Sequence, residues 1–217
     1  MDWRKAKLYD IIASLGRNEE IKLSSLPDIE LYMEQLLHLL NGKLQPVGRP
    51  GDDKPLTKTM INNYTKHHLL LPPKNKKYTK DHIISLILIH QLKNVLDLGD
   101  IKRLLTPVLR DISTPDDDIM PLGEIYSAFT SLKKEQFAEF CAGIADKVSA
   151  IDDKTAGIKD EENRQIATMF LVVLMLVAQA NACKSLAEQI IDNYFAPVPA
   201  PVEEVEAEAR ELWGEPV

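Results

Sequence analysis

Hydrophobic residues recur at helical spacing along most of the chain, and this pattern predicts a mainly helical protein. Residues 1–24 show it first, with Gly16 near the end of the apolar series. Pro72 and Pro73 interrupt the pattern further on, because proline cannot continue a helix. We expect helices over residues 1–24, 29–40, 56–67, 79–95, 100–105, 122–133, 134–150 and 160–195.

Several of these helices carry start or stop signals. Asn41 and Gly42 are expected to end the helix over residues 29–40. Thr79 is expected to be the N-cap of the next long helix, which Leu98-Gly99 would separate from the short helix before Pro107. The chain therefore has several helices connected by short turns.

Changes in composition divide the chain into four parts. Residues 113–118 (STPDDD) are expected to be a domain boundary, either a solvated linker or the start of a helix. Residues 196–217 form a proline-rich, acidic tail that we expect to be disordered. The predicted parts are an N-terminal helix (1–24), a first domain (25–112), a helical effector or dimerisation domain (113–195) and the tail (196–217).

The expected helix over residues 160–195 contains the most apolar segment of the chain. Its run Ile166–Ala180 has 15 residues and is followed by Asn181, whereas a membrane-spanning helix needs about 20. We expect no membrane association. The segment is interpreted either as the central helix of a bundle or as a helix that pairs two copies in a homodimer.

Composition is ordinary for a soluble protein, with 45% hydrophobic and 27% charged residues. Cys141 and Cys183 have no metal-ligand spacing, and the N-terminus lacks the apolar region of a signal peptide. These features favour a cytoplasmic protein without a cofactor or metal ion.

Charge is distributed unevenly along the chain. Residues 54–80 contain seven lysines and no acidic residue, although the whole chain carries a net charge of −7. A cationic segment in an acidic protein is typical of a surface that faces a polyanion, and a solvated charge run is the simpler alternative.

The expected helix over residues 56–67 lies inside this segment and has two different sides. Its apolar residues fall on one side, and a polar stripe falls on the other. Amides can bond base edges and lysines can neutralise phosphates, but any surface helix also has a polar side. The stripe consists of Lys58, Asn62 and Lys66, flanked by Thr59 and Asn63.

Several motifs in order carry a resemblance to a known family. The segments LTKTMINNY, LLPP and KKYTKDH, followed by GDIKRLL at residues 99–105, resemble the DNA-binding domain of MerR-type regulators. The chain resembles more closely an uncharacterised bacterial domain-of-unknown-function family that is described as MerR-like. Asn62 stands where that domain usually has arginine, and His68 where it usually has glycine.

The resemblance implies a MerR-like winged helix-turn-helix domain, followed by a helical C-terminal domain. The protein would then be a sequence-specific regulator of transcription that binds double-stranded DNA, either as a homodimer through residues 160–195 or as a monomer, and a small effector could bind its C-terminal half. Tyr64 would lie in the core or on a phosphate, and Tyr78 in the core or in the wing. The implied major-groove residues are Lys58, Thr59, Asn62, Asn63 and Lys66, and the implied wing residues are Lys74, Lys76, Lys77 and Tyr78.

The sequence also bears on two other classes of function. A protein-interaction module with a winged fold and no DNA role would suit the isoelectric point near 5.3 and the acidic tail. An enzyme is not expected, because no catalytic or nucleotide-binding motif occurs and His67, His68 and His82 lack metal-ligand spacing.

Overall fold

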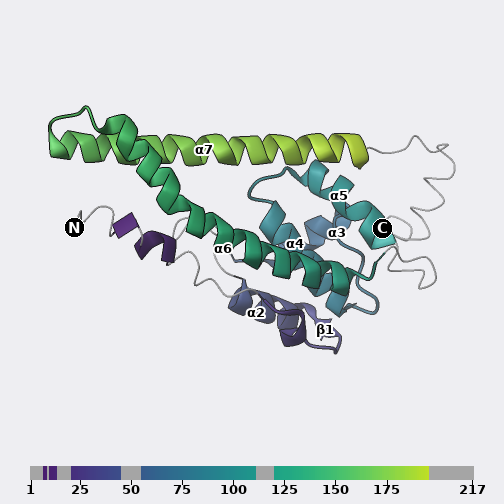
Figure 1. Cartoon of the computed structure of the whole chain (residues 1–217). Coiled ribbons are helices and arrows are strands. Elements are labelled where there is room, and N and C mark those ends of the chain that lie inside the picture. The colour runs from purple at the N-terminus through teal and green to yellow at the C-terminus, as the bar shows by residue number, and fades with distance from the viewer. Residues whose placement is uncertain (1–6, 9, 14–20, 45–54, 111–119, 196–217) are drawn as a thin grey trace. The chain divides into compact units, whose positions relative to one another are not determined.

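The computed structural model describes residues 7–8, 10–13, 21–44, 55–110 and 120–195 (Figure 1). The described chain is mainly helical, which confirms the predicted fold class at that level. Residues 7–8 and 10–13 are helical, and the elements that follow are η1 (Leu23–Ser25), β1 (Leu31–Tyr32), α2 (Met33–Lys43), α3 (Lys58–Lys66), β2 (Lys77–Tyr78), α4 (Lys80–Leu92), α5 (Leu98–Arg110), α6 (Leu122–Thr155) and α7 (Glu161–Tyr194).

Contacts within the chain define two compact units. Unit 1 is built from Met1–Glu20 and Phe129–Leu186, and unit 2 from Ile21–Ala128 and Ala187–Val217. Both divisions that involve described residues fall inside long helices, α6 and α7. The predicted boundary over residues 113–118 and the predicted tail over residues 196–217 lie outside the described residues.

Unit 2 is organised around α4 and a two-stranded antiparallel sheet. β1 pairs with β2 so that Leu31 lies opposite Tyr78 and Tyr32 opposite Lys77. α4 is buried along almost its whole length, as expected for a helix that is apolar on several sides. The fully buried side chains of this core are Leu36, Leu40, Ile61, Leu69, Leu70, Ile83, Ile84, Leu86, Ile87, Ile89, Ile101 and Tyr126.

The last residues of α7 also belong to unit 2. Ile191 is buried in its core, and Asp192 forms an ion pair with Arg103 of α5, with 2.8 Å between Oδ1 and Nη1. Arg103 also pairs with Asp100 within α5. The end of α7 is therefore held by both apolar and ionic contacts.

Unit 1 is a packing of α6 against α7, the two longest helices (Figure 1). Ile144 and Val148 of α6 and Val172 of α7 are buried, and Leu8 and Ile12 pack against them. Nearer the turn between the helices, the hydroxyls of Thr155 and Thr168 are 2.9 Å apart and buried. These contacts define an inner side of α7.

The structure confirms one predicted start of a helix and corrects others. Thr79 is the N-cap of α4, as predicted. α3 begins at Lys58, after its N-cap Thr57, and not at the expected Leu56. The expected helix over residues 29–40 was wrong at its start, because Leu31 and Tyr32 form β1 and pair with a segment 45 residues later. Residues 21–24 are not α-helical either, since only a short 3-10 turn occurs at Leu23–Ser25.

The predicted breaks within the later helices were also wrong. α6 continues through the expected break near residue 133, where neither glycine nor proline stands to interrupt it. α5 begins at Leu98 and continues past Pro107. Leu105 and Leu109, on either side of this proline, are buried, and their burial offsets the backbone hydrogen bond that proline cannot donate.

Candidate nucleic-acid interface

Polar contacts with the backbone fix the start of α3. The Thr57 hydroxyl accepts a hydrogen bond from the Met60 N–H at 3.2 Å. The Asn41 side chain, near the end of α2, accepts from the Leu56 N–H at 2.7 Å and donates to the Leu56 carbonyl at 3.0 Å. Asn41 therefore joins α2 to the residue before the α3 cap.

α3 has a buried side and an exposed side. Ile61 and Tyr64 lie in the core of unit 2. The five residues that the sequence predicts for the major groove are all exposed, and none of their side chains forms a hydrogen bond or ion pair within the described part of the chain. These residues are Lys58, Thr59, Asn62, Asn63 and Lys66.

The end of α3 uses a backbone conformation that usually requires glycine. His68 has a φ of 57°, in the left-handed region. The Leu69 N–H donates to the Tyr64 carbonyl at 2.8 Å, and the His68 N–H donates to that of Thr65 at 3.0 Å. This pair of bonds is the Schellman motif. His68 therefore adopts here the backbone conformation that glycine favours.

The predicted basic wing contains a tight turn over Lys74–Lys77. The Lys77 N–H donates to the Lys74 carbonyl at 3.0 Å, and the two central residues, Asn75 and Lys76, have φ values of 54° and 61°. Positive φ at both central positions defines a type I′ turn, which usually contains Asn-Gly. The second position here is lysine, and its side chain is exposed.

The lysines of the acid-free segment differ in their partners. Lys77 pairs with Glu30 at 3.4 Å and lies 5.9 Å above the Tyr32 ring, and Lys80 pairs with Asp28 at 2.6 Å. Four other lysines are exposed and form no ion pair with the described residues; they are Lys58, Lys66, Lys74 and Lys76. Among the described lysines of this segment, these four therefore present charge that no described acidic residue neutralises.

Both tyrosines that the sequence offered as possible DNA contacts lie in the core. Tyr64 and Tyr78 are 8% and 4% exposed, and burial raises the pKa of each phenol above its usual value. The Tyr78 ring meets His82 edge to face, with 5.5 Å between the ring centroids. Of the two positions expected for each ring, core or DNA contact, both rings occupy the core. Neither tyrosine is therefore part of the proposed contact surface.

Sequence reasoning missed the residues that shape this surface from outside the segment. Asn41 carried only the signal of a helix stop, and nothing local indicated its bonds to Leu56. Asp28 and Glu30 lie outside the acid-free segment, and β1–β2 pairing brings Glu30 beside Lys77. A charge count along the chain cannot detect such pairs.

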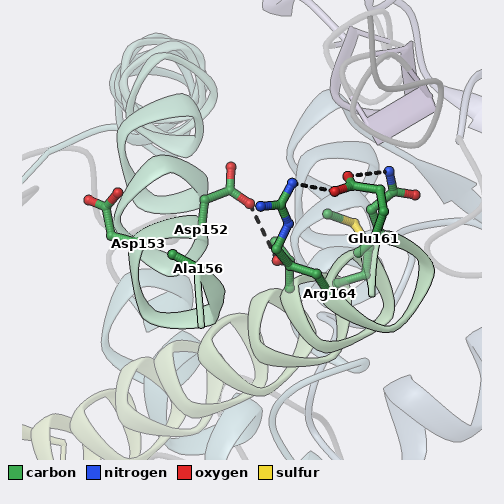
Figure 2. Close-up of a pocket in the computed structure, with 8 residues that line it drawn as sticks. Asp152, Asp153, Ala156, Glu161 and Arg164 are labelled. Atoms are coloured by element: carbon green, nitrogen blue, oxygen red, sulfur yellow. Dashed lines mark hydrogen bonds and ion pairs between the residues drawn. The ribbon is translucent and has the colours of Figure 1, made fainter. Parts of the chain in front are cut away.

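Unit 1 contains a pocket of about 360 Å³ between the end of α6 and the start of α7 (Figure 2). Three of its four charged lining residues have partners: Arg164 pairs with Glu161, and the Thr168 hydroxyl donates to Asp152 at 3.3 Å. This geometry does not identify a ligand, and the effector stays a prediction.

α7 is long and apolar enough to cross a membrane by length and composition. Only 11% of its most apolar stretch is buried within the structure. Besides the basic surface of α3 and the turn, the described chain therefore has a second exposed surface, which is apolar and lies on α7.

The site belongs to a mainly helical protein in which one helix and one tight turn present lysines without an ion pair to any described residue. A family model described as a domain of unknown function, DUF1836, matches residues 21–129, and the chain belongs to this family. No curated protein and no solved structure matches the chain.

Proposed function

We propose that unit 2 contains a MerR-like winged helix-turn-helix and that the protein is a sequence-specific, DNA-binding regulator of transcription. In this proposal α3 is the recognition helix in the major groove, and the turn over Lys74–Lys77 is the wing on the DNA backbone. The motif resemblance over residues 56–105 and the surface chemistry of those two elements support it.

The four unpaired lysines are the observation that carries the proposal. The protein has 33 acidic residues, so acidic partners are abundant. Lys77 and Lys80 each form an ion pair with one of them. Lys58 and Lys66 on α3, and Lys74 and Lys76 on the turn, have no acidic partner among the residues that the structure describes. Their summed positive potential favours a polyanionic partner over a neutral one.

The amides on α3 would supply sequence discrimination. Asn62 and Asn63 are exposed between Lys58 and Lys66 on the same helix. Asparagine can bond adenine through two hydrogen bonds, which contribute about 1–3 kcal/mol of discrimination against the wrong base. The lysines contact phosphate without reading sequence, because an ammonium group lacks the planar fork of arginine.

Binding to a pool of fragments from the source genome, measured at several salt concentrations, tests this proposal. Replacing Lys58 and Lys66 by alanine should lower the slope of log affinity against log salt by about two, roughly one for each phosphate contact. The matched control replaces Lys77 and Lys80, and we expect little change because acidic residues already neutralise both. Equal effects of the two pairs would contradict the assignment of the contact surface.

Selection from the same pool separates the two leading functions. Enrichment of a particular sequence, relaxed at one base by Asn62→Ala, would support the regulator. Weak binding that salt abolishes, without enrichment, would exclude it and favour the protein-interaction module.

A further inference from the structure

The basic surface of unit 2 consists of Lys58 and Lys66 on α3 and of Lys74 and Lys76 on the turn. All four side chains are exposed, and none has an acidic partner among the residues that the structure describes. Because few residues separate Lys66 from Lys74, their Cα atoms are at most about 28 Å apart. One extended acidic segment is therefore long enough to contact both elements.

The acidic tail of the same chain has the opposite charge. Residues 196–217 contain six glutamates and one basic residue, Arg210, which gives the tail a net charge of −5. The basic surface carries four positive charges, so the two charges are of similar size. The glutamates are Glu203, Glu204, Glu206, Glu208, Glu211 and Glu215.

The tail starts from the unit that bears the basic surface. Phe195, the last described residue, packs against the core of unit 2, and Asp192 pairs with Arg103 of the same unit. An extended chain carries residues 203–215 up to about 26–66 Å beyond Phe195. A compact domain of about 100 residues has a radius of gyration of about 13 Å, so half its circumference is about 53 Å. The tail is therefore long enough to reach the basic surface wherever that surface lies on unit 2.

The spacing of the glutamates also suits the polar stripe of α3. Successive members of the stripe are four residues, or about 6 Å, apart along the helix. Glu204, Glu206 and Glu208 alternate along the tail, and every second side chain of an extended chain lies on the same side, about 6.6 Å from the next. Two of these carboxylates can meet the lysines while the middle one accepts from the Asn62 amide. The stripe consists of Lys58, Asn62 and Lys66.

We propose that the acidic tail docks on the basic surface of its own chain and is displaced when another polyanion binds there. Opposite charges attract, and the covalent link keeps the tail at an effective concentration in the millimolar range. Exposed ion pairs are individually weak, so a polyanion of higher charge density displaces the tail. The docking itself does not require DNA binding, whereas its consequence, competition with DNA, rests on the proposed function.

Cross-linking of the full chain with a carbodiimide tests the docking without DNA. The reagent activates a carboxyl group, a lysine amine attacks the activated carbon, and an amide forms as a urea leaves, so only groups in contact are joined. We expect amides between residues 203–215 and the four lysines of the basic surface, identified by mass spectrometry of the digested protein. In a mixture of unlabelled and isotope-labelled chains, the joined peptides should carry the same label, because each tail docks on its own chain.

Two ion pairs of the fold are positive controls in the same digest. Lys80 and Asp28 are 2.6 Å apart and Lys77 and Glu30 are 3.4 Å apart, so both pairs should be joined at any salt concentration. The tail amides should become rarer between about 0.05 M and about 0.5 M salt, where the Debye length falls from about 14 Å to about 4 Å. Control amides without tail amides would overturn the proposal, as would a tail that is joined only to lysines elsewhere or to another copy.

Affinity for a duplex of arbitrary sequence measures the competition. Removing three tail charges should raise the affinity by about five-fold at low salt, because a tethered competitor is weakened. It should also make the affinity depend more steeply on salt, since salt weakens the tail contact as well. The tail variant is Glu204→Gln with Glu206→Gln and Glu208→Gln.

A second variant controls for the change in net charge. It removes the same number of charges from exposed residues of unit 1 and should raise the affinity less. Equal gains in the two variants would overturn competition by the tail. The control variant is Glu135→Gln with Glu139→Gln and Asp146→Asn.

The two measurements separate this inference from the proposed function. Amides between the tail and the basic surface, in a protein that binds no DNA, would support the docking and contradict the proposed function. DNA binding by a chain that forms no such amides would support the proposed function and overturn the docking.

Discussion

The outer side of α3 and the outer side of α7 are both exposed sides of helices whose inner sides are packed, but they expose opposite chemistry. α3 presents lysines and amides, which water solvates well. α7 presents large apolar side chains, Phe170 and Val173 among them, whose exposure to water is unfavourable. Exposure of the α3 surface to water therefore costs the unbound protein little free energy. Exposure of the apolar α7 surface is unfavourable, so this surface favours association.

The largest expected effect separates the inner side of α3 from its outer side. Ile61 is fully buried, so Ile61→Ala should lower the free energy of unfolding by about 2–5 kcal/mol through lost burial and a cavity. The adjacent Asn62 is exposed, and Asn62→Ala should change stability by less than about 0.5 kcal/mol.

Urea denaturation followed by circular dichroism measures both variants. If Asn62→Ala proved as destabilising as Ile61→Ala, the exposed side of α3 would contribute to the stability of the fold. That result would contradict its interpretation as a binding surface.

A second prediction concerns how the α3 surface is held in place. Asn41→Leu should lower the free energy of unfolding by about 1–3 kcal/mol, because the Leu56 N–H and carbonyl lose their partners. His38 lies one helical turn earlier on α2 and forms no hydrogen bond among the described residues, so His38→Leu is a suitable control. Equal midpoints for Asn41→Leu and wild type in chemical denaturation would show that the Asn41 bonds do not anchor α3.

The two surfaces also differ in how far the sequence could reveal them. Charge is visible in a sequence, and the acid-free run with its Lys58, Asn62 and Lys66 stripe correctly predicted an exposed polar side on α3. The cap at Thr79 was predictable because the bonds of a helix cap are local. The Thr79 N–H donates to the His82 side chain three residues later, as the Met60 N–H donates to the Thr57 hydroxyl at the start of α3.

Features that depend on distant pairing could not be predicted in this way. The apolar run Ile166–Ala180 allowed either a buried or an exposed helix, because hydrophobic spacing does not say how many neighbours a helix has. β1 forms because Leu31 meets Tyr78, and the partners of Lys77 and Lys80 follow from the same fold. Local propensity had assigned Leu31 to a helix, and tertiary contacts outweighed it.

A third prediction separates the charge of the α3 surface from the stability of the unit that carries it. His82 lies buried at the start of α4. Burial lowers the pKa of His82, so below about pH 6.5 the unfolded chain binds a proton that the folded chain does not. Stability should therefore fall on acidification, by up to about 1.4 kcal/mol from this residue at pH 5.5.

His82→Gln provides the comparison for that pH dependence. Glutamine at this position can accept the Thr79 N–H, as His82 Nδ1 does at 3.0 Å, but it does not titrate. The loss of unfolding free energy between pH 7.5 and 5.5, from urea titrations, should be smaller in the variant. An unchanged loss would assign the pH dependence to other groups, such as His68, whose pKa burial also lowers.

The smallest expected effect has the opposite sign. Lys76 holds a left-handed backbone conformation that costs a residue with a side chain about 1–2 kcal/mol, whereas glycine adopts it freely. Lys76→Gly creates the Asn-Gly pair that type I′ turns favour, and should stabilise the protein by about 0.5–1 kcal/mol after the larger entropy of the unfolded glycine is allowed for.

Lys76→Gly should nevertheless weaken DNA binding, since it removes one of the four unpaired lysines and lowers the salt slope by about one. Lys74→Ala is the matched control, because Lys74 lies in the same turn without a positive φ, so its replacement should weaken binding without stabilising the fold. A thermal melt and a salt titration of each variant separate the two effects. A lysine kept where glycine would be more stable indicates a role outside the fold. If Lys76→Gly were more stable and bound DNA as tightly as the wild type, Lys76 would not contact DNA. The proposed contact surface would then be limited to α3.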